Sequence, residues 1–323
     1  MGACLLRPVN RLLRRTRHRY VRAMLQSTEQ VMARPAGGAE RLMRRLETAR
    51  GLDRITSPIS GFVNRVLPPG KVRDVLHGVP LGHAAHPALV QIPLGAWLSA
   101  VVLDRVPGTG RSAQVLVGVG TLAAAPAALA GVVDWAKGHE SQLRVGIIHW
   151  ATNTIAVACF TASFIQRVRG RQAAGRQLAL VGIGAASVGG YLGGHLAHRL
   201  ALGANHVESV PYLLPEGWHT VAALDELPER ELARRVVGSV PVLLYREGDD
   251  VKAVAAQCSH LSGPLDEGDL QKGPGGAICV VCPWHGSEFS LADGAVVHGP
   301  ATSPQPSFQT RITNGQVEIA LPT

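Results

Sequence analysis

Two cysteine–histidine pairs in the last quarter of the sequence could bind a metal. Cys258 and His260 form a C-x-H pair, and Cys282 and His285 form a C-x-x-H pair. Thiolate and imidazole are common protein ligands of borderline metals, and four of them complete one closed site. One cysteine and one histidine on each of two loops suit a two-iron cluster. A structural zinc site is the alternative, although zinc knuckles usually repeat one ligand type within each pair.

The residues around these pairs resemble the Rieske iron–sulfur family over roughly residues 216–323. Beyond the four ligand positions, the resemblance rests on Gly263, Pro264, Leu265, Pro283, Gly286, Phe289, Asp293, Gly294, Gly299, Pro300, Ala301, Pro304 and Pro306. It implies a 2Fe–2S cluster whose buried iron is bound by Cys258 and Cys282. His260 and His285 would bind the outer iron, and the proline-rich run would cover the cluster as a lid.

Two departures from the high-potential members of that family predict a lower reduction potential. Those members carry an extra cysteine in each loop, joined as a disulfide, whereas the matching positions here are Gly263 and Trp284. They also place a serine and a tyrosine hydroxyl near the cluster sulfurs. Ser287 is present, but the tyrosine position is Phe289. Hydrogen bonds to sulfur stabilise the reduced cluster. Their loss predicts a potential nearer to that of the soluble ferredoxins serving ring-hydroxylating oxygenases.

The composition indicates membrane helices beside this domain. Of 323 residues only 4% are aromatic and 17% charged, while the net charge is +9. A basic chain can bind nucleic acid or an anionic membrane surface. No nucleic-acid motif accompanies the charge, so we expect no nucleic-acid partner and favour the lipid bilayer. The other cysteines, Cys4, Cys159 and Cys279, show no pairing pattern, and the last two are expected in packed cores.

Four apolar runs, at about 88–104, 113–133, 146–166 and 178–198, are each about long enough to span a bilayer. Short loops between them predict an up-and-down bundle. This block resembles a family of small four-helix bacterial membrane domains of unknown function. The resembling residues are Gly82, His83, His86, Pro87, Ile92, Pro93, Leu94, Gly95, Gly131, Asp134, Trp135 and 149–153.

The predicted fold class is therefore multi-domain, with an all-α four-helix transmembrane bundle followed by an all-β Rieske domain of antiparallel sheets. The expected boundaries are a basic helical segment at 1–75, the bundle at 76–200, a linker at 201–215 and the Rieske domain at 216–323. Apolar runs predict hairpins at 240–245 with 251–256 and at 308–313 with 316–320. A short helix is expected at 227–234.

Helix direction alone should bring several polar side chains to one leaflet, on the side where the Rieske domain follows. They are His83, His86, Asp134, Trp135, His149, Asn153, His195 and His198. A site formed by His86, Asp134, His149 and His195 could hold haem b or a quinone. In the haem alternative, the ligands would be His149 and either His86 or His195. The other interpretation is that these side chains only cap helices at the headgroup level.

These features predict a membrane-anchored Rieske electron-transfer protein with a redox partner of unknown identity. The alternative is a non-catalytic, membrane-tethered redox sensor. A terminal oxygenase would need a further mononuclear iron domain, for which no length remains after the cluster domain. An arginine-rich N-terminus and an even number of spans place the Rieske domain in the cytoplasm, on a multi-pass protein of the inner membrane.

Overall fold

The computed structural model describes residues 37–322, and the chain divides into two compact units, 1–46 and 47–323. In the first unit, helix α2 (Gly38–Glu47) begins where the sequence predicts a cationic helix. Arg44 forms an ion pair of 2.6 Å with Glu40, one turn earlier. The arginine-rich stretch at 7–22 and Cys4 lie outside the described residues.

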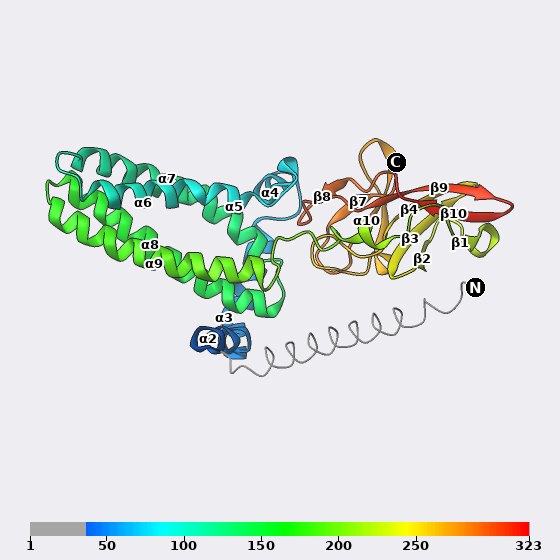
Figure 1. Cartoon of the computed structure of the whole chain (residues 1–323), viewed down its shortest axis with the longest axis horizontal. Coiled ribbons are helices and arrows are strands. Elements are labelled where there is room, and N and C mark those ends of the chain that lie inside the picture. Colours follow the sequence, from blue (N-terminus) through cyan, green and yellow to red (C-terminus); the bar gives the residue numbers. More distant parts are fainter. Residues whose placement is uncertain (1–36, 323) are drawn as a thin grey trace, which may run out of the picture. The chain divides into compact units, whose positions relative to one another are not determined.

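The α-helices of the second unit and its first two 3-10 helices precede its strands in the chain (Figure 1). They are η1 (Arg50–Leu52), α3 (Asp53–Val66), α4 (Lys71–His77), η2 (Val79–Leu81), α5 (Ala85–Leu89), α6 (Gln91–Leu103), α7 (Gly110–Trp135), α8 (Glu140–Val168), α9 (Gln172–His198) and α10 (Val210–Leu213). By length and composition, four helical stretches could cross a membrane: Ala85–Leu103, Gly110–Trp135, Glu140–Val168 and Gln172–His198. These stretches contain nearly all of the four apolar runs.

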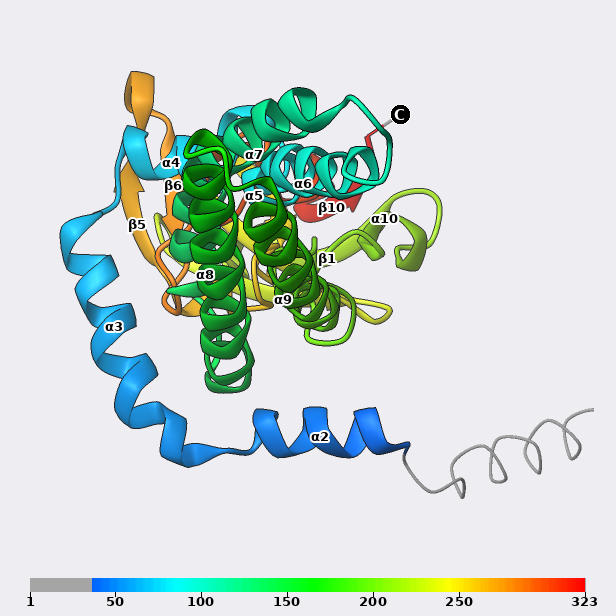
Figure 2. The ribbon, with the colours of Figure 1, turned by 90° about the vertical axis from the view of Figure 1, so that its left-hand side faces the viewer.

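The four apolar helical stretches lie side by side, as Figure 2 shows. Small residues let them approach closely. A side-chain carbon added to Gly120 of α7 would lie 2.6 Å from the Trp97 ring of α6. One added to Gly182 of α9 would lie 2.9 Å from the Phe160 ring of α8. The two aromatic rings stack on each other, with centroids 4.3 Å apart. Glycine therefore lets the helices approach until the aromatic side chains fill the centre of the bundle.

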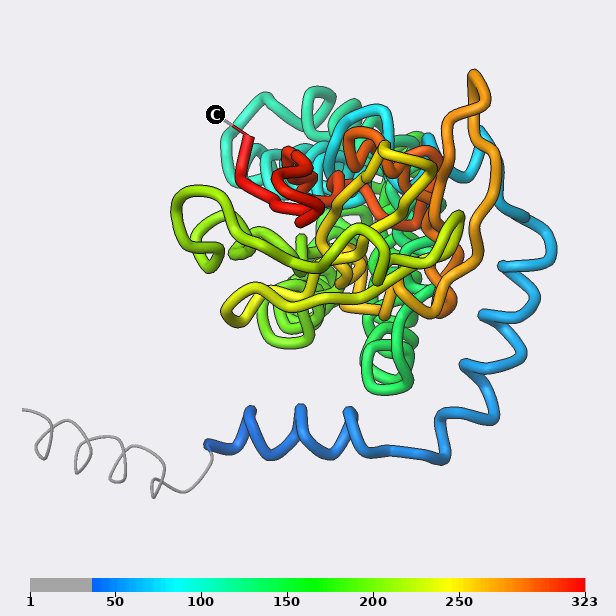
Figure 3. Tube along the Cα trace, turned by 90° about the vertical axis from the view of Figure 1, so that its right-hand side faces the viewer, coloured from blue at the N-terminus to red at the C-terminus, as the bar shows by residue number. Residues whose placement is uncertain are grey.

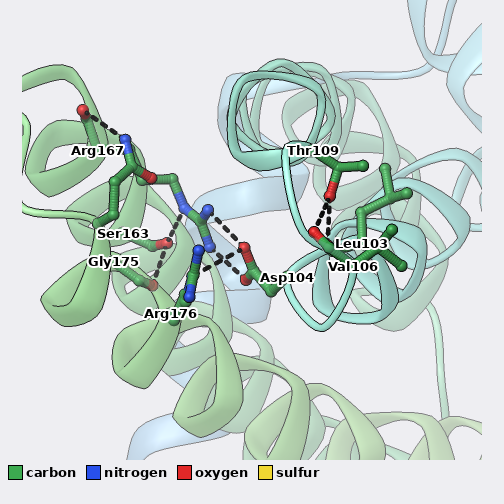
Figure 4. Close-up of polar contacts among 9 residues, drawn as sticks. Leu103, Asp104, Val106, Thr109, Ser163, Arg167, Gly175 and Arg176 are labelled. Atoms are coloured by element: carbon green, nitrogen blue, oxygen red, sulfur yellow. Dashed lines mark hydrogen bonds and ion pairs between the residues drawn. The ribbon is translucent and has the colours of Figure 1, made fainter.

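A buried ion pair joins the ends of α6 and α8 (Figure 4). Arg167 donates two hydrogen bonds to the Asp104 carboxylate, at 2.8 and 2.6 Å, and its side chain is 0% exposed. Arg176 lies 3.7 Å from the same carboxylate. Ser163 donates to the Gly175 carbonyl at 2.6 Å, which ties α8 to α9 beside the ion pair. Buried charged groups are costly unless they are paired with good hydrogen-bond geometry, and Arg167 and Asp104 meet this condition.

The C-terminal part, which runs from yellow-green to red in Figure 3, consists of two antiparallel sheets. The six-stranded sheet has the order β1-β10-β9-β4-β3-β2, and the four-stranded sheet has the order β5-β6-β7-β8. The strands are β1 (His219–Ala223), β2 (Leu232–Val237), β3 (Val240–Glu247), β4 (Asp250–Ala255), β5 (Asp269–Lys272), β6 (Ile278–Val281), β7 (Glu288–Ser290), β8 (Val296–His298), β9 (Ser307–Thr313) and β10 (Gln316–Ala320). Both expected hairpins form, as β3–β4 and β9–β10.

The helix expected at 227–234 is wrong, because the chain there forms a short turn and then strand β2. Ala233 and Val237 of β2 point into the core, and the strand pairs with β3 along its whole length. Pairing with β3 therefore overrides local helix propensity. The expected linker also packs against the sheets, since Val207, Val210 and Leu214 are buried in the same core as β3 and β10.

Replacing Arg167 with alanine should destabilise the bundle by about 3–5 kcal/mol, because it leaves the Asp104 carboxylate buried without its partner. Unfolding of the detergent-solubilised chain measures this loss. Arg169→Ala, an exposed arginine two residues away, is the matched control. A double variant that exchanges the two charges should recover part of the loss. Equal stability of the Arg167→Ala and Arg169→Ala chains would contradict this role.

Candidate metal centre

Two tight loops carry the paired cysteine and histidine residues. The first follows β4, where the Cys258 amide donates to the Gly263 carbonyl at 2.8 Å. The second joins β6 to β7, where the Cys282 amide donates to the Ser287 carbonyl at 2.8 Å. Gly286 turns this loop with a φ of 78°, a conformation that glycine adopts without steric cost. Backbone hydrogen bonds thus fix both loops independently of any bound group.

The two loops bring the two expected histidine ligands together, and likewise the two expected cysteine ligands. The rings of His260 and His285 have centroids 5.0 Å apart. The thiols of Cys258 and Cys282 form a hydrogen bond, which lowers the pKa of Cys282 to about 7 and raises that of Cys258. A side-chain carbon at Gly263 would lie 2.7 Å from the Cys282 sulfur, so glycine keeps this space open.

Both histidines are suited to metal binding because they are neutral near pH 7. Burial lowers the pKa of His260 well below its usual value, and the neighbouring His285 adds to the effect. Burial also lowers the pKa of His285 to about 4, together with His139 and Lys137. The His260 Nδ1 atom is buried without a hydrogen-bond partner. A buried, unpaired lone pair is costly unless a metal binds it, so this donor set fits a two-iron cluster.

The surroundings of the thiols agree with the expected departures from high-potential centres. Phe289 is fully buried in the core that contains Cys258 and Cys282, and its ring offers no hydroxyl. Ser287 accepts a hydrogen bond of 2.9 Å from the Ala301 amide of the proline-rich segment, which leaves its own proton available to a sulfur. Cys279 is buried too, and burial raises its pKa to about 11, so its thiol remains protonated.

The histidine end of these loops lies against the segment that joins α7 to α8. The ring centroid of His139 is 5.4 Å from that of His285 and 5.6 Å from that of Trp284. The Asp74 carboxylate accepts hydrogen bonds from His298 Nδ1 at 2.8 Å and from the Gly299 amide at 2.9 Å. The sequence analysis missed Asp74 and His139, because partners more than a hundred residues away leave no local pattern.

The four residues expected to form a membrane site do not share one set of contacts. His86, Asp134 and His149 line a cavity of about 790 Å³ among the helices, which is open at the bundle surface where its lining includes the exposed Trp150. His195 does not line this cavity and instead lies 2.8 Å from the Glu47 carboxylate. The Asp134 carboxylate also bonds at 2.6 Å to the fully buried His77, which the sequence analysis did not single out.

Comparison with known proteins agrees with this division. Residues 217–309 match the Rieske [2Fe-2S] domain family, and residues 82–206 match a family described as predicted membrane protein (DUF2231). The anthranilate 1,2-dioxygenase ferredoxin subunit of Burkholderia cepacia is 38% identical over 32% of this chain and 90% of its own length. Ferredoxin CarAc of Metapseudomonas resinovorans is 32% identical over 32% of this chain and 92% of its own.

Among solved structures, the ferredoxin of carbazole 1,9a-dioxygenase from Nocardioides aromaticivorans is 25% identical, covers 33% of this chain and 100% of its own, and gives a TM-score of 0.30. Through its C-terminal domain, the chain belongs to the Rieske [2Fe-2S] family. That domain binds a 2Fe–2S cluster and serves electron transfer. The matching ferredoxins extend over about a third of this chain, so they carry no information about its membrane half.

Replacing His260 or His285 with alanine should abolish the Rieske-type EPR signal, because each change removes one ligand of the outer iron. Cys279→Ser, which alters a buried thiol outside the two loops, is the control and should keep the signal. Metal analysis should find two irons per chain in the parent protein. A colourless protein that holds zinc would contradict the assignment.

Proposed function

We propose that this protein is a membrane-anchored one-electron carrier. Cys258 and Cys282 hold the buried iron of its cluster, while His260 and His285 hold the outer iron. The four long apolar helices keep the cluster at the membrane, as an inner-membrane protein with the Rieske domain in the cytoplasm. Electrons pass between the cluster and either a partner oxidoreductase or a membrane quinone.

The contact between His139 and His285 is the observation that carries this proposal. The outer iron of a Rieske cluster is the one held by histidines, so the path for electrons leads through those rings. Here one of them lies beside the loop that connects two candidate membrane-spanning helices. Asp74, which accepts two hydrogen bonds from residues 298 and 299, supports the same arrangement.

The partner is inferred from the relatives. The similar proteins are named as ferredoxins, one of them as a subunit of a dioxygenase. A ferredoxin of this kind passes electrons between other redox proteins. By analogy, we propose that the partner of this chain is an oxygenase or an electron-transferring oxidoreductase. Cluster oxidation, followed after addition of candidate partners to membranes containing the full chain, tests this directly.

The reduction potential should lie in the lower part of the Rieske range, which runs from about −150 to +300 mV. Phe289→Tyr should raise it by about 40 mV, because one added hydrogen bond to sulfur contributes about 1 kcal/mol to a one-electron couple. A redox titration followed by EPR measures the shift. Phe308→Tyr is the matched control, since Phe308 packs in the core of the six-stranded sheet, in a cluster without the ligand cysteines. A potential near the upper limit for the unmodified chain would contradict the prediction.

The Rieske domain should face the cytoplasm. The basis is the charge rule for short loops, in which lysine and arginine stay inside. The two ends of the bundle carry nearly equal positive charge, and the N-terminal arginines, with an even number of spans, favour a cytoplasmic C-terminus. A green fluorescent protein fused to Thr323 should fluoresce, and an alkaline phosphatase fused there should be inactive. The reverse pattern would overturn the orientation.

A further inference from the structure

The membrane half consists of two copies of one helical hairpin. Asp104 and Arg167, which form the buried ion pair, are 63 residues apart. The same shift relates Trp97 to Phe160, the two stacked aromatic rings. The second helix is α7 in the first copy and α9 in the second. These two helices correspond with a shift of 62 residues instead of 63, which relates Gly120 to Gly182. Each of these glycines packs against the aromatic ring of its own copy.

This internal repeat relates His86 to His149, and their contacts are the same. His86 Nδ1 lies 2.8 Å from the Ala127 carbonyl of α7, and His149 Nδ1 lies 2.8 Å from the Gly189 carbonyl of α9. One turn after each of these carbonyls, α7 and α9 each have a glycine that lies against the histidine ring. A side-chain carbon at Gly131 would lie 2.8 Å from the His86 ring, and one at Gly193 would lie 3.1 Å from the His149 ring.

These hydrogen bonds fix which ring nitrogen carries the proton. A carbonyl oxygen only accepts, so Nδ1 of each ring is the donor and Nε2 keeps a free lone pair. Within the part of the chain that the structure describes, Nε2 of His86 makes no hydrogen bond. The Asn153 amide nitrogen lies 3.3 Å from both ring nitrogens of His149 and makes its shorter hydrogen bond, of 2.8 Å, to the backbone carbonyl of His149. Metal-binding histidines are typically held in this way, by a backbone carbonyl on the other nitrogen.

The spacing of the two rings matches a metal held between them. With metal–nitrogen bonds of about 2 Å and about 1.2 Å from a ring nitrogen to its ring centre, two imidazoles on opposite sides of one metal have centres about 6.4 Å apart. The His86 and His149 centroids are 6.2 Å apart, and the ring planes are nearly perpendicular, at 82°.

The cavity indicates which group would supply the metal. Its volume of about 790 Å³ lies within the range of cofactor sites, about 300–1,000 Å³. Its walls are mostly apolar and include Trp97, Val90 and Ala124. His86 and His149 are only two metal ligands, and within the described part of the bundle no group of three or more metal-binding side chains surrounds them, so a bare ion would lack ligands. The two histidines offer acceptors, which suit a metal and not the carbonyl oxygens of a quinone. A porphyrin provides four further nitrogens and a large apolar surface.

We propose that His86 and His149 are the two axial ligands of a b-type haem at the end of the membrane half from which the Rieske domain follows. This goes beyond the proposed function, which needs only the Rieske cluster. Asp134 and residues 202–204 line both the haem cavity and a small pocket at His260. These residues therefore lie between the haem cavity and the pocket beside the cluster ligand His260. Haem and cluster can exchange one electron, with one iron oxidised from Fe²⁺ to Fe³⁺ as the other is reduced.

The test is to produce the full chain in bacterial membranes with sufficient haem, purify it in detergent and measure haem and cluster in the same sample. We expect one b haem per chain, six-coordinate and low-spin in both redox states. The near-perpendicular rings should give the oxidised haem a strongly anisotropic EPR signal. His86→Ala and His149→Ala should each remove the low-spin spectrum and leave the Rieske signal, which also reports that the chain has folded. His83→Ala is the matched control, because His83 lies at the same end of the bundle and is exposed.

A second pair of variants keeps both histidines. Gly131→Ala should displace the His86 ring and lower the haem content several-fold. Gly184→Ala should have no effect, because nothing lies within 4 Å of the added carbon. A parent chain that holds its cluster but binds no haem, even after incubation with haemin, would overturn the proposal and leave the proposed function intact. Low-spin haem retained in both histidine variants would overturn it equally.

Discussion

An imidazole can bind a metal only through a free lone pair, and both halves of this protein keep histidines in that state. In the Rieske domain, burial holds His260 and His285 neutral, and the Nδ1 atom of His260 is left without a partner. In the bundle, Nδ1 of His86 and Nδ1 of His149 each donate a hydrogen bond to a backbone carbonyl. The loops and the helices around these rings supply the burial and the acceptors. The fold thus sets the protonation of each ring before any metal arrives.

In the bundle, the histidines are held in this state by two copies of one helical hairpin. A hairpin that presents one histidine, one central aromatic ring and one charged end cannot bury them alone. Two copies in one chain pair histidine with histidine, Trp97 with Phe160, and Asp104 with Arg167. Glycine at matching places on α7 and α9 lets each ring lie close to its neighbouring helix. The second copy has phenylalanine in place of tryptophan and arginine in place of aspartate, and the change from aspartate to arginine gives an ion pair where two carboxylates would repel.

Local patterns predicted what depends on local spacing. The C-x-H and C-x-x-H pairs, the apolar runs and the Asn314-Gly315 turn, with both φ angles positive, are of this kind. The helix expected at 227–234 was wrong because pairing with β3 is a tertiary effect. His77 and Asp74 were missed because their partners, Asp134 and His298, lie 57 and 224 residues away. The internal repeat was present in the sequence, but its small apolar residues hide the shift that relates the two copies.

The most direct test of the account is pulsed EPR on the reduced full chain, kept in its native membrane. The two irons of the reduced cluster couple to a total spin of one half, and this spin interacts strongly with nitrogen nuclei that bind an iron directly. The account predicts two strongly coupled imidazole nitrogens, one from His260 and one from His285. A cluster spectrum without such couplings, as four cysteine ligands would give, or with a single coupled nitrogen, would contradict it.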